Sequence, residues 1–254
     1  MRTFIIFTKK ELLESLRTYR LIIMLIVFML IGILSPLTAL LMPRVIGSLD
    51  LGEGVEIILP EPTAMDGWEQ FFSNVGMMGM LILIIVFSGI MANEFSRGTL
   101  VNLLTKGLNR TTVILSKFVA ATLVWTAAYL ICLIVTMAYI TFLWELDLQN
   151  AILAFVSPWL FGLFLIAMLT FGGVLFASFA GSLALTGGMI ITLMLLNVAP
   201  NIARYNPISL AGSAVALLNG IQSVENFIPT IIICAVAIII FIIASIVVFG
   251  KKRV

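Results

Sequence analysis

Six long apolar runs, separated by shorter polar segments, make up most of the chain. They cover residues 21–42, 71–93, 117–143, 151–177, 183–199 and 229–249. A helix needs about 20 apolar residues to cross the hydrocarbon core of a bilayer, so each run is long enough to be a span. The pattern predicts an all-α, polytopic membrane protein whose residues 1–254 form one transmembrane domain.

The segment before the first span, residues 1–20, has a different pattern. Ile5, Leu12 and Leu16 recur at helical spacing among charged positions, which predicts an amphipathic helix lying in the membrane interface. A secretory signal peptide is the alternative, but the run at 21–42 is too long for a signal core and is followed by no small-residue cleavage site.

The polar segment at 94–116 lies between the second and third spans and predicts a short helix. Leu100, Leu103 and Leu104 fall on one face of that helix, and Gly107 can take the left-handed conformation that ends it. A short helix with one apolar stripe at a membrane edge must place the stripe on lipid head groups or in a groove of another protein. Both possibilities remain open at this point.

Polar residues at the two ends of this segment have specific expected roles. Asn109 is placed to cap the third span. Glu94 lies at the inner end of the second span, where a carboxylate faces the unfavourable end of the helix dipole and needs a compensating partner. Arg97, Arg110 and Lys117 are candidates in this chain; a group on a partner protein and simple solvation are the alternatives.

Charge predicts the orientation in the membrane. With both termini and residues 93–117 inside, the inner side carries twelve basic residues against three acidic ones, and the outer side two against nine. An excess of Lys and Arg marks the cytoplasmic side, so we expect both termini in the cytoplasm and residues 43–70 and 200–228 outside. The acidic segment 43–70 is either a solvated loop or a mouth that favours cationic cargo. The net charge of +2 gives no indication of a nucleic-acid partner, and we expect none.

Three further patterns concern packing and the outer surface. Residues 63–72 predict a short interfacial helix before the second span. Gly173, Ala177 and Gly181 repeat at every fourth residue, a spacing that permits close helix contact either within the chain or between subunits. Between residues 206 and 220 a second short helical piece follows the fifth run, which is itself short. The two pieces indicate an interrupted span, a re-entrant external hairpin or a helix on the outer surface.

Composition excludes several kinds of chemistry. The chain is 62% hydrophobic and 10% charged, and it contains no His. Cys132 and Cys234 lie in apolar runs without neighbouring metal ligands, so we expect packing roles and no metal site. None of the apolar cores holds an Asp, Glu, Lys, Arg or His, which gives no support for a proton-driven pump. The sequence has no phosphate-binding loop, so we expect no enzyme activity and no cofactor in this chain.

The polar segment, together with the six-span layout, resembles type-2 ATP-binding-cassette (ABC) permeases. The resemblance is carried by Glu94, by Gly98-Thr99-Leu100, by Leu103-Leu104 and by Gly107 followed by Arg110. This sequence departs from the family at Leu108-Asn109, where many members have a Pro before the Arg segment. The similarity covers essentially the whole chain and also favours the external hairpin, which the family usually carries before its last span.

The resemblance implies a permease subunit in a bacterial plasma membrane. A second permease, identical or related, and an ABC ATPase that binds ATP and magnesium would complete the transporter, with membrane lipids around it. It also implies export of a hydrophobic or amphipathic cargo such as a peptide, lipid or drug, or self-protection against antimicrobial peptides. The residues that it assigns to ATPase coupling are Glu94, Arg97, Gly98, Thr99, Leu100, Leu103, Leu104, Lys106, Gly107 and Arg110.

Two other hypotheses remain. The chain could be a membrane scaffold or immunity protein that moves no cargo, or an autonomous secondary transporter. Co-purification of an ATPase separates the permease from both. If the coupling assignment is correct, Gly98→Pro or Glu94→Lys uncouples transport without abolishing membrane insertion.

Overall fold

The computed structural model describes residues 2–47, 60–96, 108–145 and 148–252, and these residues form helices joined by turns. The elements are α1 (Arg2–Arg17), α2 (Arg20–Gly47), α3 (Ala64–Asn74), the π-helical η1 (Val75–Gly79), α4 (Met80–Phe87), α5 (Ala92–Ser96), α7 (Arg110–Leu143), α8 (Ala151–Phe176), α9 (Phe179–Leu196), α10 (Pro200–Ala203), α11 (Ser209–Gly212), α12 (Ala214–Leu218) and α13 (Val224–Lys251).

Six helical stretches are long and apolar enough to cross a membrane, which confirms the expected all-α, six-span fold. They are α2, the stretch Ala64–Phe95, α7, α8, α9 and α13. Several run beyond the apolar runs. Helix α2 continues through Pro43 to Gly47, and α7 begins at Arg110, seven residues before the expected start. Asn109 caps α7 as expected, because its side chain accepts a hydrogen bond from the Thr111 amide at 3.1 Å.

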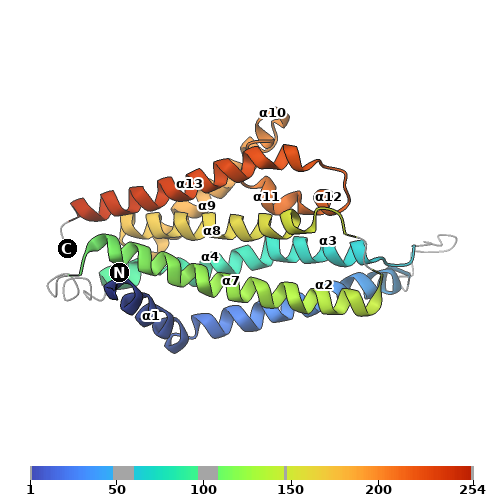
Figure 1. Ribbon diagram of the computed structural model, residues 1–254, viewed down its shortest axis with the longest axis horizontal. Helices are drawn as coiled ribbons and strands as arrows, with labels where there is room; N and C mark the ends of the chain where they lie inside the picture. Colours follow the sequence, from blue (N-terminus) through green and yellow to red (C-terminus); the bar gives the residue numbers. More distant parts are fainter. Residues whose placement is uncertain (1, 48–59, 97–107, 146–147, 253–254) are drawn as a thin grey trace.

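The spans form an elongated bundle in which α1, α5, the start of α7 and the end of α13 lie at one end, here called the α1 end (Figure 1). The short helices α11 and α12 lie towards the other end. Helix α8 runs through the middle and packs against α7, α9, α12 and α13. Helix α2 packs against α3 and α7. Because α7 also packs against α8, these two helices connect the side of the bundle that contains α2 with the side that contains α9 and α13.

The aromatic core near α3 differs from the sequence expectation. Trp68 is fully buried and lies against Phe71 and Phe155, with ring centroids 5.6 and 4.8 Å away. Helix α3 continues directly into η1 and α4. The residues predicted as a separate interfacial helix are therefore the first part of the second span. Their aromatic side chains pack on α8 because burying these large rings in the bundle contributes more than an interfacial position would.

The small residues near the fourth and fifth spans do not form one helix face. Ala177 ends α8 in the left-handed conformation, with φ of 51°, and Gly181 belongs to α9. Gly173 lies against Met91 of the same chain, where an added Cβ would be 2.9 Å from the Met91 Cβ. Nearby, the Ser182 hydroxyl donates to the Leu169 carbonyl at 3.0 Å. In this chain, Gly173 therefore serves internal packing.

The chain after α9 forms three short helices before α13. Helix α10 stands out from the side of the bundle (Figure 1). The helical piece expected between residues 206 and 220 is present as α11 and α12, divided at Ser213. Gly220 follows with φ of 66°, which glycine adopts without the steric cost that a side chain brings.

Candidate functional site

Helix α1 is attached to the bundle by its polar face. Thr8, Glu11 and Ser15 recur at helical spacing and are buried, while Ile5 and Ile6 are exposed by 64% and 60%. The buried stripe packs on α7, where the Ser116 hydroxyl lies 3.5 Å from the Phe4 carbonyl. The apolar face is therefore available to the membrane interface, and the polar face is held by protein.

Lys117 of α7 joins this helix to the end of the second span. Its ammonium nitrogen donates to Glu11 at 2.7 Å and to Glu94 at 2.9 Å. All three side chains are less than 10% exposed. Breaking a buried pair costs several kcal/mol because it leaves an uncompensated charge away from water. The Lys117 ammonium therefore fixes α1, α5 and α7 relative to one another.

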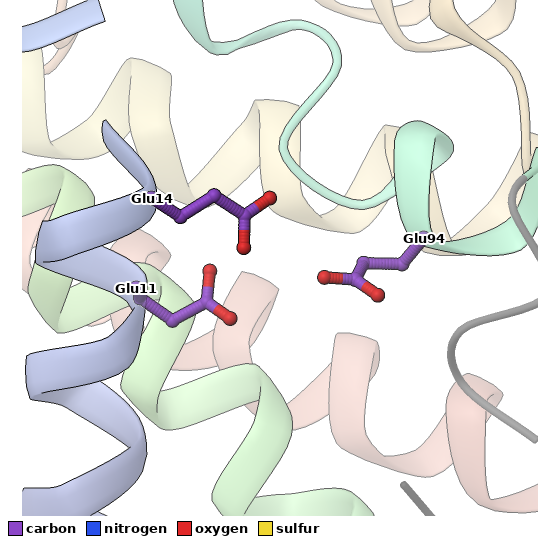
Figure 2. Close-up of side chains that lie close together, drawn as sticks. All are labelled: Glu11, Glu14 and Glu94. Carbon is purple, nitrogen blue, oxygen red and sulfur yellow. The ribbon is translucent and has the colours of Figure 1, made fainter. Parts of the chain in front are cut away.

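Three carboxylates meet at this point, and a second lysine, Lys10, also contacts them. Glu11 and Glu14 of α1 extend toward Glu94 of α5 (Figure 2), and their oxygens lie within 4.8 Å of one another. Lys10 donates to Glu11 at 3.0 Å, pairs with Glu14 at 2.8 Å and lies 3.7 Å from Glu94. We call Lys10, Glu11, Glu14, Glu94 and Lys117 the α1 clamp.

The ionic contacts shift the titration of the outer members of the α1 clamp. Burial alone would raise the pKa of Glu14, but the hydrogen bond and charge of Lys10 outweigh it, and the pKa lies below its ordinary value. Burial alone would lower the pKa of Lys10, but Glu14 and Glu11 raise it overall. Both groups are therefore held in their charged forms.

A cavity of about 270 Å³ opens beside the α1 clamp. Arg20, Ile90 and Asn93 line it together with Lys10, Glu14, Glu94 and Lys117. The cavity is bounded by α1, by the beginning of α2, by α5 with the turn that precedes it, and by α7. A relative movement of α1 and α5 therefore changes its shape directly.

Glu94 lies at the end of the second span, Ala64–Phe95, as expected, but it belongs to a short helix of its own. The second span turns after Phe87, and Glu94 falls in the first turn of α5. A carboxylate in that position faces the favourable, positive end of the helix dipole. The interaction that compensates its burial is nevertheless the one with Lys117, one of the three partners that the sequence suggested.

Arg110, on the other side of residues 97–107, binds the last turn of α13. Its guanidinium donates to the backbone carbonyls of Phe249, Gly250 and Lys252, the latter two at 3.1 and 2.8 Å. The last carbonyls of a helix have no intrahelical donor, so the guanidinium satisfies groups that water would otherwise have to bind. It also lies over the Phe249 ring, 5.4 Å from its centroid.

A second set of contacts connects α5 to α8 and α13. The Phe95 and Phe249 rings meet edge to face with centroids 5.8 Å apart. The Lys252 ammonium lies 4.8 Å from the Phe95 ring centroid and donates to the Val174 and Leu175 carbonyls at 2.8 and 3.2 Å. We call Phe95, Arg110, Phe249 and Lys252 the α13 anchor.

Of the ten residues predicted for coupling, the structure places Glu94 in the α1 clamp and Arg110 in the α13 anchor. The others, Arg97, Gly98, Thr99, Leu100, Leu103, Leu104, Lys106 and Gly107, lie outside the described residues. Sequence reasoning missed Glu11, Lys252 and the role of Phe95. A polar stripe at 8, 11 and 15 is the signal that could have identified the buried face of α1.

The fold and the site define a multi-pass helical membrane protein in which the two ends of one inter-span segment are fixed by ionic and aromatic contacts. Comparison with known proteins identifies the class. Residues 5–254 match the ABC-2 family transporter protein family. The chain belongs to this family of ABC transporter permeases, which confirms the resemblance seen in the sequence.

The chain is also similar to an uncharacterized transmembrane protein, YxlG, of Bacillus subtilis (strain 168). The two are 27% identical over 119 residues, which is 46% of this chain and 46% of the relative. The chain thus spans about half the length of this curated relative.

Proposed function

We propose that this protein is the membrane-spanning subunit of an ABC transporter and is driven by a separate ABC ATPase through residues 94–110. In this proposal the ATPase subunit binds ATP and magnesium and carries out the hydrolysis. A second permease, identical or related, completes the translocation path. Membership of the ABC-2 family supports the association with an ATPase.

The observation that carries the proposal is the anchoring of both ends of the inter-span segment. Glu94 is bound through Lys117 to α1, and Arg110 is bound to the last turn of α13. Phe95 and Lys252 add contacts to α13 and α8. A force applied between these two ends is therefore transmitted to four helices, α1, α7, α8 and α13. Such transmission is required if movement of a partner protein is to move the spans.

The distribution of charge and apolar surface supports a proposed orientation and class of cargo. Lys10, Lys117, Arg110 and Lys252 all lie at the α1 end, so the excess of basic residues supports a cytoplasmic position for this end. Apolar spans suit a hydrophobic or amphipathic peptide, lipid or drug better than a sugar or a free ion. We propose export as the direction, by analogy with the family.

ATP hydrolysis in lipid nanodiscs tests the proposal. The chain is co-expressed with an ABC ATPase that co-purifies with it, and hydrolysis is measured for the complex, for the ATPase alone and for a complex with Glu94→Gln. We expect hydrolysis to require both subunits and to fall about tenfold in the variant, because the mutation uncouples the segment from α1 and α7. Glu69→Gln, the same chemical change at an exposed position of α3, is the matched control and should retain normal activity.

Two results would contradict the proposal. One is failure of any ATPase to co-purify with the folded chain. The other is full hydrolysis by a stable complex that carries Glu94→Gln.

A further inference from the structure

A polar hollow of about 420 Å³ lies between the end of α9 and the beginning of α13. Its lining includes Asn197, Arg204, Gln222, Asn226 and Thr230. Thr230 lies six residues into α13, about 9 Å along its axis at 1.5 Å per residue. The hollow therefore lies beside the first turns of α13, at the opposite end of that helix from the α13 anchor.

The backbone that carries Arg204 is fixed on two sides. The Thr230 hydroxyl donates to the Arg204 carbonyl at 2.6 Å. Two residues further on, the buried Asn206 side chain donates to the Leu193 carbonyl at 2.6 Å and accepts from the Ile208 amide at 3.1 Å. These contacts tie the segment to both α13 and α9, so the position from which the guanidinium extends is defined by the fold.

The hollow presents donors that the described residues do not use. Within the described part of the chain, no carboxylate pairs with the Arg204 guanidinium, and no group hydrogen-bonds the side-chain amides of Asn197, Gln222 or Asn226. A planar guanidinium beside amide N–H groups matches the geometry of a phosphate, which it can bind by two parallel hydrogen bonds. The hollow thus has the chemistry of a phosphate site.

Exposed apolar side chains lie next to lining residues along the chain. Val198, Tyr205 and Ile228 directly follow Asn197, Arg204 and Phe227 in the sequence, and they are exposed by 80%, 48% and 47%. Helix α9 is itself largely exposed along its apolar length. A ligand that fills the hollow with an anion can therefore lay a hydrocarbon chain on the neighbouring surface, which a free anion cannot do.

We propose that this hollow binds the phosphate head group of a phospholipid, with Arg204 as its principal ligand. The acyl chains lie on the exposed apolar surface around α9 and α10. In the orientation proposed above, the site is at the outer leaflet. The inference goes beyond the proposed function, and it does not require coupling to an ATPase.

Native mass spectrometry of the full chain, released from a maltoside detergent, tests the site. Phosphatidylglycerol is titrated against diacylglycerol with the same acyl chains, and inorganic phosphate is added as a competitor. We expect phosphatidylglycerol to bind more tightly than diacylglycerol, and Arg204→Gln to weaken it about tenfold, the loss of a charge-assisted hydrogen bond. Arg204→Lys should give an intermediate affinity, because a lysine keeps the charge but not the planar pair of donors.

Matched variants separate this site from general lipid binding. Arg44→Gln makes the same charge change at the other arginine expected outside and should leave binding unchanged. Asn226→Ala, at an exposed residue of the lining, should weaken binding several-fold without loss of folding and tests the site independently of Arg204.

Equal affinity of the wild type for phosphatidylglycerol and diacylglycerol would overturn the proposal, as would unchanged binding in folded Arg204→Gln and Asn226→Ala. Inorganic phosphate that displaces the lipid at an equal concentration would show a simple anion site instead. Since no ATPase is present, each of these results leaves the proposed coupling function unaffected.

Discussion

The indole of Trp125 lies directly against the backbone of Gly162, where a Cβ would be 2.3 Å from the Trp125 Cε2 atom. The same indole donates to the Trp159 carbonyl at 3.0 Å. We therefore expect Gly162→Ala to lower the free energy of unfolding by about 1 to 3 kcal/mol, because the methyl group forces the close contact of α7 and α8 apart. Thermal unfolding in detergent, followed by tryptophan fluorescence, measures the effect.

Gly188→Ala is the matched control for that experiment. Gly188 lies within α9, and a Cβ there would meet nothing within 4 Å. Alanine is favoured over glycine in a helix by about 1 kcal/mol, so this variant should be neutral or slightly stabilised. Equal unfolding temperatures for the two variants would show that the Trp125 contact does not restrict residue 162.

Removing the charge of Lys117 should release α1 from the bundle. We expect Lys117→Met to cost about 3 to 5 kcal/mol, because Glu11 and Glu94 then remain buried without their shared cation. The measurement is the rate of limited proteolysis within α1, with Lys9→Met, at an exposed position on the same helix, as control. A triple variant that adds Glu11→Gln and Glu94→Gln should recover much of the loss. If it recovers nothing, the shape of the lysine matters more than its charge.

The α13 anchor predicts a local effect of Arg110. Arg110→Gln removes donors from the carbonyls at the end of α13, and each hydrogen bond from a charged group contributes about 1.5 to 3 kcal/mol. Hydrogen exchange should therefore speed up in the last turn of α13 and remain unchanged near its start at Val224. Arg17→Gln, at the exposed end of α1, controls for the charge change. Unchanged exchange at residues 249–252 would contradict the assignment.

The lowered pKa of Glu14 predicts a pH dependence of stability. A carboxyl group whose pKa is lower in the folded than in the unfolded protein stabilises the fold above its unfolded value, and this contribution is lost as the pH falls through the folded value. The wild type should therefore unfold at a higher temperature than Glu14→Gln at pH 6, and the difference should shrink as the pH falls below 4.5. A difference that stays constant down to pH 3 would show that the Lys10 contact does not determine it.

The sequence allowed the spans to be predicted because apolar runs of about 20 residues are a strong local signal. It also indicated that Glu94 needs a partner, since the positions of a carboxylate and of a helix end can be read locally. It could not choose Lys117 among three candidates, nor find Glu11, because that choice depends on how α1 docks on a span more than 100 residues later. The short helix predicted within residues 94–116 lies mostly outside the described residues and stays a prediction.

Trp68 shows the limit of reasoning from residue type. An indole near the end of an apolar run is typical of a membrane interface, yet this one is enclosed by Phe71 and Phe155. The deciding factor is the aromatic surface that α8 places opposite α3. The position of Trp68 in the sequence does not indicate that Phe155 of α8 will lie beside it in the fold.

The long sequence separation of the two attachments has a consequence for synthesis of the protein. Glu11 and Lys117 are 106 residues apart, and Arg110 and Phe249 are 139 residues apart. At roughly 5 to 20 residues per second, Arg110 waits on the order of ten seconds after its own translation before its acceptors exist. The residues of the Glu11–Lys117 contact are therefore translated well before those of the Arg110–Phe249 contact. The nascent chain passes through a stage in which α1 can already be docked while α13 is still missing.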